Sequence, residues 1–173
     1  MDDELGLVHV YTGEGKGKTT AALGMCARAV GHGYRAMVVQ FMKTAGTYGE
    51  NFLQLPGLDV VASGHDCLVF SEKITQADLD KAAEGMRLAA EAMRCGRYRI
   101  VVLDEVSVAI KFGLVGTADV VRAIKERQPG VEVVITGRYA PPELLEIADY
   151  ISEIKAVRHP YQRGIISRKG VDR

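Results

Sequence analysis

The sequence contains no tryptophan, and its 173 residues carry no net charge, because 22 lysines and arginines balance 22 aspartates and glutamates. Proteins that hold nucleic acid by neutralising phosphates have a basic excess, so this composition argues against nucleic acid as a partner. No run of about 18 apolar residues is present, so we expect no membrane-spanning segment. The start, MDDE, is acidic and unlike a secretory signal peptide.

Cysteine is also scarce. Cys26, Cys67 and Cys95 are widely spaced and form neither a CxxC pair nor a zinc-binding pattern. A reducing, cytoplasmic compartment fits this usage best. We expect Cys26 and Cys95 to be buried as small apolar residues. Glycine, in contrast, is abundant at 19 residues, which indicates ligand sites built from backbone groups.

The length and the hydrophobic content of 47% predict a single domain spanning residues 1–173, with short tails at 1–6 and 158–173. Apolar runs alternate with helical stretches along the whole chain. We expect strands at 7–12, 36–41, 58–62, 100–104, 131–136 and 151–157. We expect helices at 18–30, from the capping box 75–78 to Gly96, at 117–127 and at 142–148. This alternation predicts an α/β fold with three layers, in which a mostly parallel sheet carries helices on both faces.

A glycine-rich segment at residues 12–20, TGEGKGKTT, lies between the first expected strand and the first expected helix. Its end matches the phosphate-loop pattern G-x-x-x-x-G-K-[ST], although Thr12 occupies the position of the first glycine. Glycines let backbone N–H groups turn toward one anion, and a helix N-terminus favours negative charge. The segment therefore predicts a nucleotide-triphosphate site in a fold like that of the P-loop NTPases (RecA-like). The candidate nucleotide-binding residues are Gly13, Glu14, Gly15, Lys16, Gly17, Lys18, Thr19 and Thr20.

Two groups of side chains carry the chemistry of such a site. Lys18 can neutralise phosphate charge, Lys16 adds a second cation at the mouth of the loop, and the Thr19 hydroxyl can join a Mg²⁺ shell. Asp104 and Glu105 follow the buried run IVVL, at the strand edge where open α/β sheets bind ligands. Either carboxylate would hold Mg²⁺ directly or through water. The metal candidates are therefore Thr19, Asp104 and Glu105.

Further segments appear in a fixed order after the phosphate loop: ARAVGHG at 27–33, VLDE at 102–105, ITGR and APP within 135–142, and RHPY and GI within 158–165. The set closely resembles the phosphate-loop type of ATP:corrinoid adenosyltransferase, from about residue 7 onward. The resemblance implies that Co(I) of a reduced corrinoid attacks the 5′-carbon of ATP, which is bound in reversed sense, and that tripolyphosphate leaves. It implies that Lys18, Thr19 and Glu105 support this transfer. By the same resemblance, Arg28 and Arg138 contact the nucleotide.

The corrinoid side of the resemblance is less complete. The family usually shows a Gly-Phe-Thr-Trp segment after the third strand, whose aromatic rings wall the lower face of the corrinoid. Here the segment reads Cys67-Leu68-Val69-Phe70, which keeps an apolar wall with less ring area. The candidate corrinoid-binding residues are Leu68, Phe70 and His159. The resemblance further implies a homodimer and an electron donor protein that supplies Co(I).

Two alternatives remain open on the sequence. A P-loop kinase or ATPase would share the loop but would release ADP. A non-catalytic nucleotide- or corrinoid-binding paralogue would bind ATP without turnover. The candidate residues also have plain structural readings, such as a solvated helix arginine at position 28, a surface loop residue at 138 or a loop histidine at 159.

Overall fold

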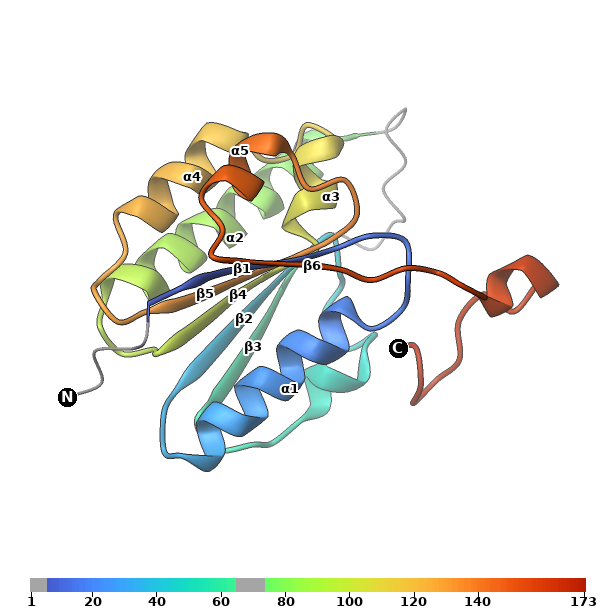
Figure 1. Ribbon diagram of the computed structural model, residues 1–173, viewed down its shortest axis with the longest axis horizontal. Coiled ribbons are helices and arrows are strands. Elements are labelled where there is room, and N and C mark those ends of the chain that lie inside the picture. Colours follow the sequence, from blue (N-terminus) through green and yellow to red (C-terminus); the bar gives the residue numbers. More distant parts are fainter. Residues whose placement is uncertain (1–5, 65–73) are drawn as a thin grey trace.

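The computed structural model describes residues 6–64 and 74–173. In these residues one sheet has the strand order β3-β2-β4-β5-β1-β6, and each neighbouring pair is parallel (Figure 1). The strands are β1 (Val8–Thr12), β2 (Ala36–Phe41), β3 (Leu58–Ser63), β4 (Ile100–Asp104), β5 (Glu132–Thr136) and β6 (Tyr150–Glu153). The helices are α1 (Lys18–Gly31), α2 (Gln76–Arg94), α3 (Val106–Lys111), α4 (Thr117–Lys125) and α5 (Pro142–Glu146), with 3₁₀ turns η1 (Gly49–Phe52) and η3 (Pro160–Arg163).

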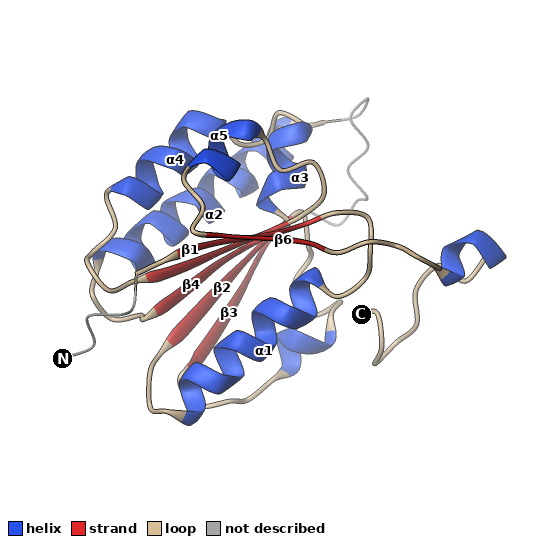
Figure 2. Cartoon of the chain, viewed as in Figure 1, coloured by secondary structure: helices blue, strands red, loops and turns tan. Residues whose placement is uncertain are grey.

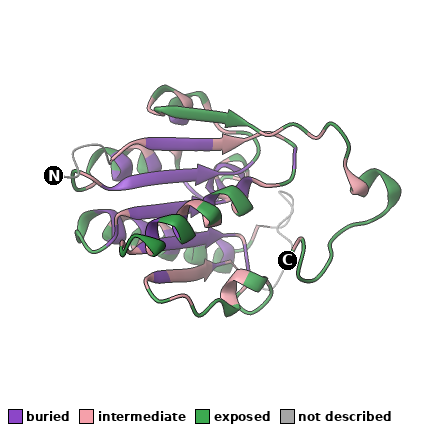
Figure 3. Ribbon diagram, turned by 60° about the horizontal axis from the view of Figure 1, so that its bottom comes forward, coloured by how far each residue is buried: buried purple, intermediate pink, exposed green. Residues whose placement is uncertain are grey.

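The sheet separates two apolar layers, as predicted. Helices α2 to α5 cover one face, and α1 covers part of the other (Figure 2). Because successive strand residues point to opposite faces, Met37, Val39 and Phe41 of β2 pack in the layer with α2. Ala36 and Val38 pack in the layer with α1. Both faces of the central strands are thereby buried, whereas β6 at the sheet edge is exposed along its length (Figure 3).

Several element boundaries and one burial expectation differ from the sequence prediction. The last strand ends at Glu153 rather than at residue 157, and the helices α4 and α5 end at Lys125 and Glu146. Helix α3 and turn η1 were not predicted, because six- and four-residue elements carry too short a periodic pattern. Cys26 is buried as expected, but Cys95 is exposed, because it lies in the C-cap position of α2.

The parallel arrangement brings the carboxyl ends of the strands to one edge of the sheet. The segments that follow β1, β2, β4 and β5 therefore emerge side by side, and the phosphate loop is the first of them. The capping box at Thr75, predicted from the sequence, begins α2 on the face of the sheet opposite α1. Among the described helices, none is long and apolar enough to cross a bilayer.

Candidate functional site

The phosphate loop connects β1 to α1, and Lys18 is the first residue of the helix. Lys18 Nζ donates to the carbonyl oxygens of Gly13 and Gly15, at 2.6 and 2.7 Å, so its side chain folds back across the loop. Burial lowers the pKa of Lys18, although the nearby Glu105 carboxylate opposes the shift. The first turn of α1 leaves its backbone N–H groups without intrahelical acceptors. The start of α1 can therefore offer backbone donors to an anion, and the buried Lys18 ammonium lies next to them.

Two loop glycines are required by the close approach of Ile154, the residue that follows β6. A Cβ on Gly13 would lie 2.6 Å from the carbonyl oxygen of Ile154, and one on Gly15 would lie 2.7 Å from the same atom. The Gly15 N–H donates to that oxygen at 2.7 Å. Gly13 also has φ 96°, in the left-handed region that favours glycine. The sequence explained these glycines by anion binding, whereas the structure shows that packing against residue 154 also requires them.

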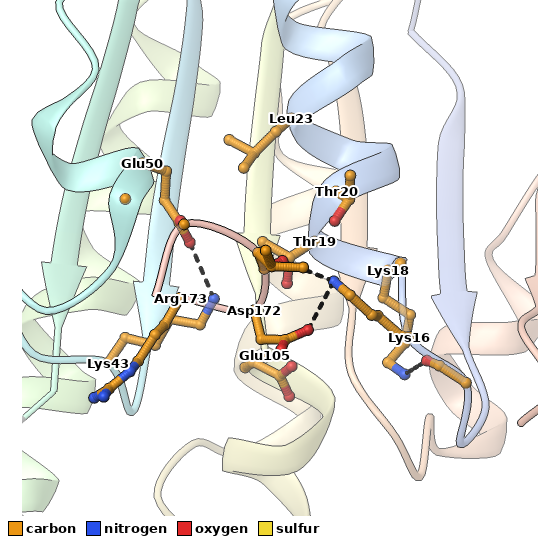
Figure 4. Close-up of a pocket in the computed structure, with 15 residues that line it drawn as sticks. Lys16, Lys18, Thr19, Thr20, Leu23, Lys43, Glu50, Glu105, Asp172 and Arg173 are labelled. Carbon is orange, nitrogen blue, oxygen red and sulfur yellow. Dashed lines mark hydrogen bonds and ion pairs between the residues drawn. The ribbon is translucent and has the colours of Figure 1, made fainter. Parts of the chain in front are cut away.

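The loop borders a cavity of about 290 Å³ (Figure 4). Besides the loop and the first turns of α1, the cavity is lined by Lys43 and Glu50, which follow β2, and by Glu105, which follows β4. Residues 170–173 line it as well. Lys16 reaches this last segment, because Lys16 Nζ lies 3.0 Å from the carbonyl oxygen of Val171. Segments distant in sequence thus enclose the phosphate loop.

Asp104 is the most highly connected carboxylate of the site. It is fully buried, and its Oδ1 accepts from Thr19 Oγ1 at 2.8 Å and from Thr136 Oγ1 at 2.7 Å. Its Oδ2 accepts from Lys43 Nζ at 2.7 Å and from Gln40 Nε2 at 3.2 Å. The four donors occupy both oxygens. Asp104 is therefore built to hold the side chains around it, above all the Thr19 hydroxyl.

Glu105 has the complementary arrangement. Its backbone is left-handed at φ 61°, and its N–H donates to Thr136 Oγ1 at 2.9 Å. This turn directs the carboxylate toward the cavity, where it faces Thr19 and Lys18 (Figure 4). Burial and the neighbouring Asp104 raise the pKa of Glu105, and Lys43 and Lys18 oppose the rise. A hard cation bound between this carboxylate and the Thr19 hydroxyl would meet the oxygen ligands that Mg²⁺ prefers.

The sequence reasoning missed Lys43 and Glu50. Lys43 Nζ lies 3.4 Å from Glu50 Oε1, and Gln40 Nε2 donates to the same oxygen at 2.8 Å. Burial alone would lower the pKa of Lys43, but the charges of Asp104 and Glu50 and the hydrogen bond to Asp104 outweigh burial and raise it. One sequence signal could have pointed to this network. It is the glutamine inside an apolar strand together with the lysine just beyond the carboxyl end of that strand.

Nearly the whole chain matches one protein family. A family model described as ATP:corrinoid adenosyltransferase BtuR/CobO/CobP matches residues 4–172. The chain belongs to the ATP:corrinoid adenosyltransferase family. A corrinoid adenosyltransferase of Pseudomonas aeruginosa is 37% identical over 175 residues, covering 98% of this chain and 85% of the relative. Those of Escherichia coli K12 and Sinorhizobium are each 36% identical, covering 98% of this chain and 87% and 81% of the respective relative.

The structure brings together some, but not all, of the residues expected in this adenosyltransferase site. Of the expected loop residues, 15–20 meet Glu105 at the cavity, with Asp104 buried behind Thr19, whereas Gly13 and Glu14 do not line it. Arg138 Nη1 lies 3.4 Å from Glu14 Oε2 on the outer side of the loop. Arg28 instead lines a separate cavity of about 730 Å³, beside β1 and β6.

Of the expected corrinoid-binding residues, only His159 lies in the described part of the chain. His159 caps η3, where its Nδ1 accepts from the Tyr161 N–H at 3.2 Å, and it does not line the cavity at the phosphate loop. Leu68 and Phe70 lie outside the described residues. The described residues thus gather most of the candidate nucleotide-binding residues of the loop, together with Glu105, around one cavity.

Proposed function

We propose that this chain transfers the 5′-deoxyadenosyl group of ATP to the Co(I) centre of a reduced corrinoid. The single observation that carries the proposal is the match to the ATP:corrinoid adenosyltransferase family over residues 4–172, together with a phosphate loop that faces a cavity. In this reaction the cobalt–carbon bond forms as the C5′–O5′ bond breaks. The electron pair of Co(I) enters the new bond, and the tripolyphosphate leaves with the pair of the broken one.

The residues of the cavity suit the departure of a polyanion. Lys18, Lys16 and the N-terminus of α1 would bind the triphosphate, because fixed positive groups stabilise the charge of the leaving group. Cobalt is the nucleophile, so no side chain has to act as a nucleophile or as a general base. The role of this chain is therefore to position ATP and to stabilise charge.

Mg²⁺ is part of the proposal, and the side chains fit it. Glu105 and the Thr19 hydroxyl would hold the ion together with phosphate oxygens, a ligand set that Mg²⁺ commonly uses. When bound, the ion would neutralise negative charge on the triphosphate. Because four donors already occupy the Asp104 carboxylate, we assign Asp104 to the support of Thr19 rather than to direct coordination. In the described residues no group of three or more His, Cys, Asp or Glu side chains forms a ready-made metal cage.

The remaining assignments rest on the family resemblance. We propose that Leu68 and Phe70 form an apolar wall for the corrinoid, and that Arg138, beside Glu14, contacts ATP at the outer side of the loop. Arg28 and His159 are away from the cavity in the single chain, so their contacts with substrate require the homodimer or a movement of the chain. An electron donor protein and a cytoplasmic location complete the proposal.

An anaerobic assay tests the function. The protein is supplied with Co(I) cobalamin, ATP and Mg²⁺, and both the cobalt–carbon product and the phosphate product are identified. We expect tripolyphosphate and adenosylcobalamin in equal amounts. ADP as the phosphate product would indicate a kinase or ATPase, and ATP binding without turnover would indicate a non-catalytic paralogue.

A pair of variants localises the activity. Lys18→Ala removes the ammonium that lies across the loop and is expected to abolish transfer. Lys81→Ala serves as the matched control, because Lys81 lies on α2 in an exposed ion pair with Glu84 and is expected to leave transfer unchanged. Equal activities of the two variants would contradict the proposed site.

A further inference from the structure

Lys43 is a buried cation to which the proposed reaction assigns no role. It follows β2, and its side chain is 10% exposed. Its ammonium lies 2.7 Å from Asp104 Oδ2 and 3.4 Å from Glu50 Oε1, and 4.6 Å from the centre of the Tyr48 ring. An ammonium held by two carboxylates and an aromatic face has a single defined position. Lys43 is therefore a fixed charge at the wall of the phosphate-loop cavity.

The backbone around Lys43 is equally constrained. Met42 has φ 59°, an uncommon conformation for a non-glycine residue, and it turns the chain sharply after β2. A Cβ on Gly64 would lie 2.5 Å from the backbone nitrogen of Lys43, so the segment after β3 presses directly against this turn. Strained backbone that persists in a structure is held by its surroundings. The position of Lys43 is thus determined from both neighbouring strands.

The second carboxylate is itself held in place. Gln40 Nε2 donates to Glu50 Oε1 at 2.8 Å, and Asn51 Nδ2 donates to Gln40 Oε1 at 2.8 Å. Gln40 lies opposite Asp104 in the register of β2 with β4. One amide therefore ties the carboxylate of η1 to the carboxylate of β4, and Lys43 lies between them.

The consequence for Thr19 follows from the direction of its hydrogen bond. Thr19 Oγ1 donates its proton to Asp104 Oδ1 at 2.8 Å. A hydroxyl that has committed its proton in this way presents only lone pairs to other ligands. Lys43 holds the other oxygen of the same carboxylate. It therefore limits rotation of the Asp104 carboxylate and sets the direction from which Asp104 accepts the Thr19 hydrogen bond.

We propose that Lys43 is a positioning residue for the nucleotide–metal site: it orients Asp104, and Asp104 directs the lone pairs of Thr19 toward the cation that accompanies ATP. The inference rests on the proposed function, in particular on its assignment of Thr19 to Mg²⁺. In this proposal Lys43 contacts neither the reacting carbon nor the cobalt. Its contribution is to the orientation of groups that touch the substrate.

The test measures binding rather than turnover. Calorimetry measures the dissociation constant for ATP with Mg²⁺ and with EDTA. The value with EDTA divided by the value with Mg²⁺, called here the Mg²⁺ ratio, is compared among variants. Lys43→Met removes the ammonium and keeps most of the side-chain volume. We expect this ratio to fall about tenfold, as is common when a residue behind a metal ligand is removed. The control Lys81→Met should keep the wild-type ratio, because its side chain lies in an exposed ion pair on α2.

A double-mutant cycle tests whether Lys43 acts through Thr19. Thr19→Val removes the hydroxyl and should lower the same ratio. Since the proposed path runs from Lys43 to Asp104 to Thr19, the double variant should bind no more weakly with Mg²⁺ than Thr19→Val alone. Independent, additive falls in the Mg²⁺ ratio would overturn this path. If Lys43→Met instead keeps the wild-type Mg²⁺ ratio and only melts at a lower temperature, the ion pair stabilises the fold alone and the inference is wrong.

Removing one partner of a buried ion pair can prevent folding. Lys43→Gln then replaces Lys43→Met, because its polar end leaves less of the buried site unpaired, while its shorter and neutral side chain loses the ion pair with Asp104. The Mg²⁺ ratio should still fall, and a wild-type ratio in this variant would overturn the inference. Failure of the proposed function is a different result. It would appear as a wild-type protein that forms no cobalt–carbon bond. Failure of this inference would appear as a wild-type protein that transfers the adenosyl group and a Lys43 variant whose ATP binding still depends on Mg²⁺ as in the wild type.

Discussion

Lys16 Nζ lies 3.3 Å from Asp172 Oδ1, so a lysine of the phosphate loop is paired with a carboxylate near residue 173. The hydrogen bond from Arg168, with Lys16 also contributing, holds the pKa of Asp172 at about 2. Residues 170–173 line the same cavity as the loop. A permanent negative charge therefore lies where the negative charge of a triphosphate is expected. We therefore predict that this segment and the nucleotide compete for Lys16.

Asp172→Asn is expected to tighten ATP binding. The substitution removes the carboxylate that pairs with Lys16 and that repels phosphate. Since the ion pair is partly exposed, with Lys16 43% exposed, we expect a gain of only about two- to fivefold in the dissociation constant. Calorimetry at low salt measures the ATP dissociation constants of the wild type and the variant. Added salt should reduce the difference between them, because it screens exposed charges. Asp119→Asn, in an exposed ion pair with Arg122, is the control. Weaker ATP binding by Asp172→Asn would mean that this segment assists the nucleotide.

Thr136→Val is expected to destabilise the protein and to impair the site. The Thr136 hydroxyl accepts from the Glu105 N–H and donates to Asp104, so it links the two acidic residues. Valine leaves a buried N–H without its acceptor and removes one donor from Asp104, at a cost of about 1–3 kcal/mol in the free energy of unfolding. Urea titration measures the loss. Thr136→Ser keeps the hydroxyl and should be close to wild type. A loss in Thr136→Ser with none in Thr136→Val would instead assign the effect to packing of the methyl group.

Gly13→Ala is expected to lower stability by about 1–3 kcal/mol. The new methyl group would lie 2.6 Å from the Ile154 carbonyl oxygen, in a backbone with φ 96°. Gly24→Ala is a control of opposite sign, because Gly24 lies within α1 with open space around it. Alanine in a helix interior is favoured over glycine by about 0.5–1 kcal/mol. Urea unfolding of both variants should give changes of opposite sign, and a stable Gly13→Ala would refute the close approach.

Cys26 is expected to be unreactive in the folded protein and to contribute to a loss of stability at high pH. Burial raises the pKa of its thiol from 9.0 to about 12. Between these values the unfolded chain loses the proton and the folded chain retains it, so the free energy of unfolding falls as the pH rises above 9.0. The fall from this one group is at most about 1.4 kcal/mol per pH unit.

Two measurements check the behaviour of Cys26. A thiol reagent at pH 8 should modify the exposed Cys95 quickly and Cys26 only on unfolding. Urea titrations of the wild type and of Cys26→Ala between pH 8 and 10 should converge as the pH rises, because alanine has no proton to lose. A constant difference between the two curves would show that Cys26 does not titrate differently in the two states.

The central strands and the phosphate loop were predictable because their signals are local. An apolar run such as IVVLD and the pattern around Gly17-Lys18-Thr19 each lie within a few residues of the chain. Short elements were not predictable, since α3 and η1 have too few residues to show a period. The exposure of Cys95 was missed for a related reason: a cysteine next to a helix end looks the same in sequence whether the helix faces the core or the solvent at that point.

Sequence patterns alone predicted a mostly parallel α/β domain, a phosphate loop, a carboxylate pair after a buried strand and a resemblance to one adenosyltransferase family. The different roles of the two acidic residues became visible only in the folded chain, where four donors occupy Asp104 and Glu105 is turned toward the cavity. The same is true of the ion pair between Lys43 and Asp104 and of the ion pair between Lys16 and Asp172. These partners are far apart along the chain, and no local pattern encodes which of many charged side chains will meet when the strands align.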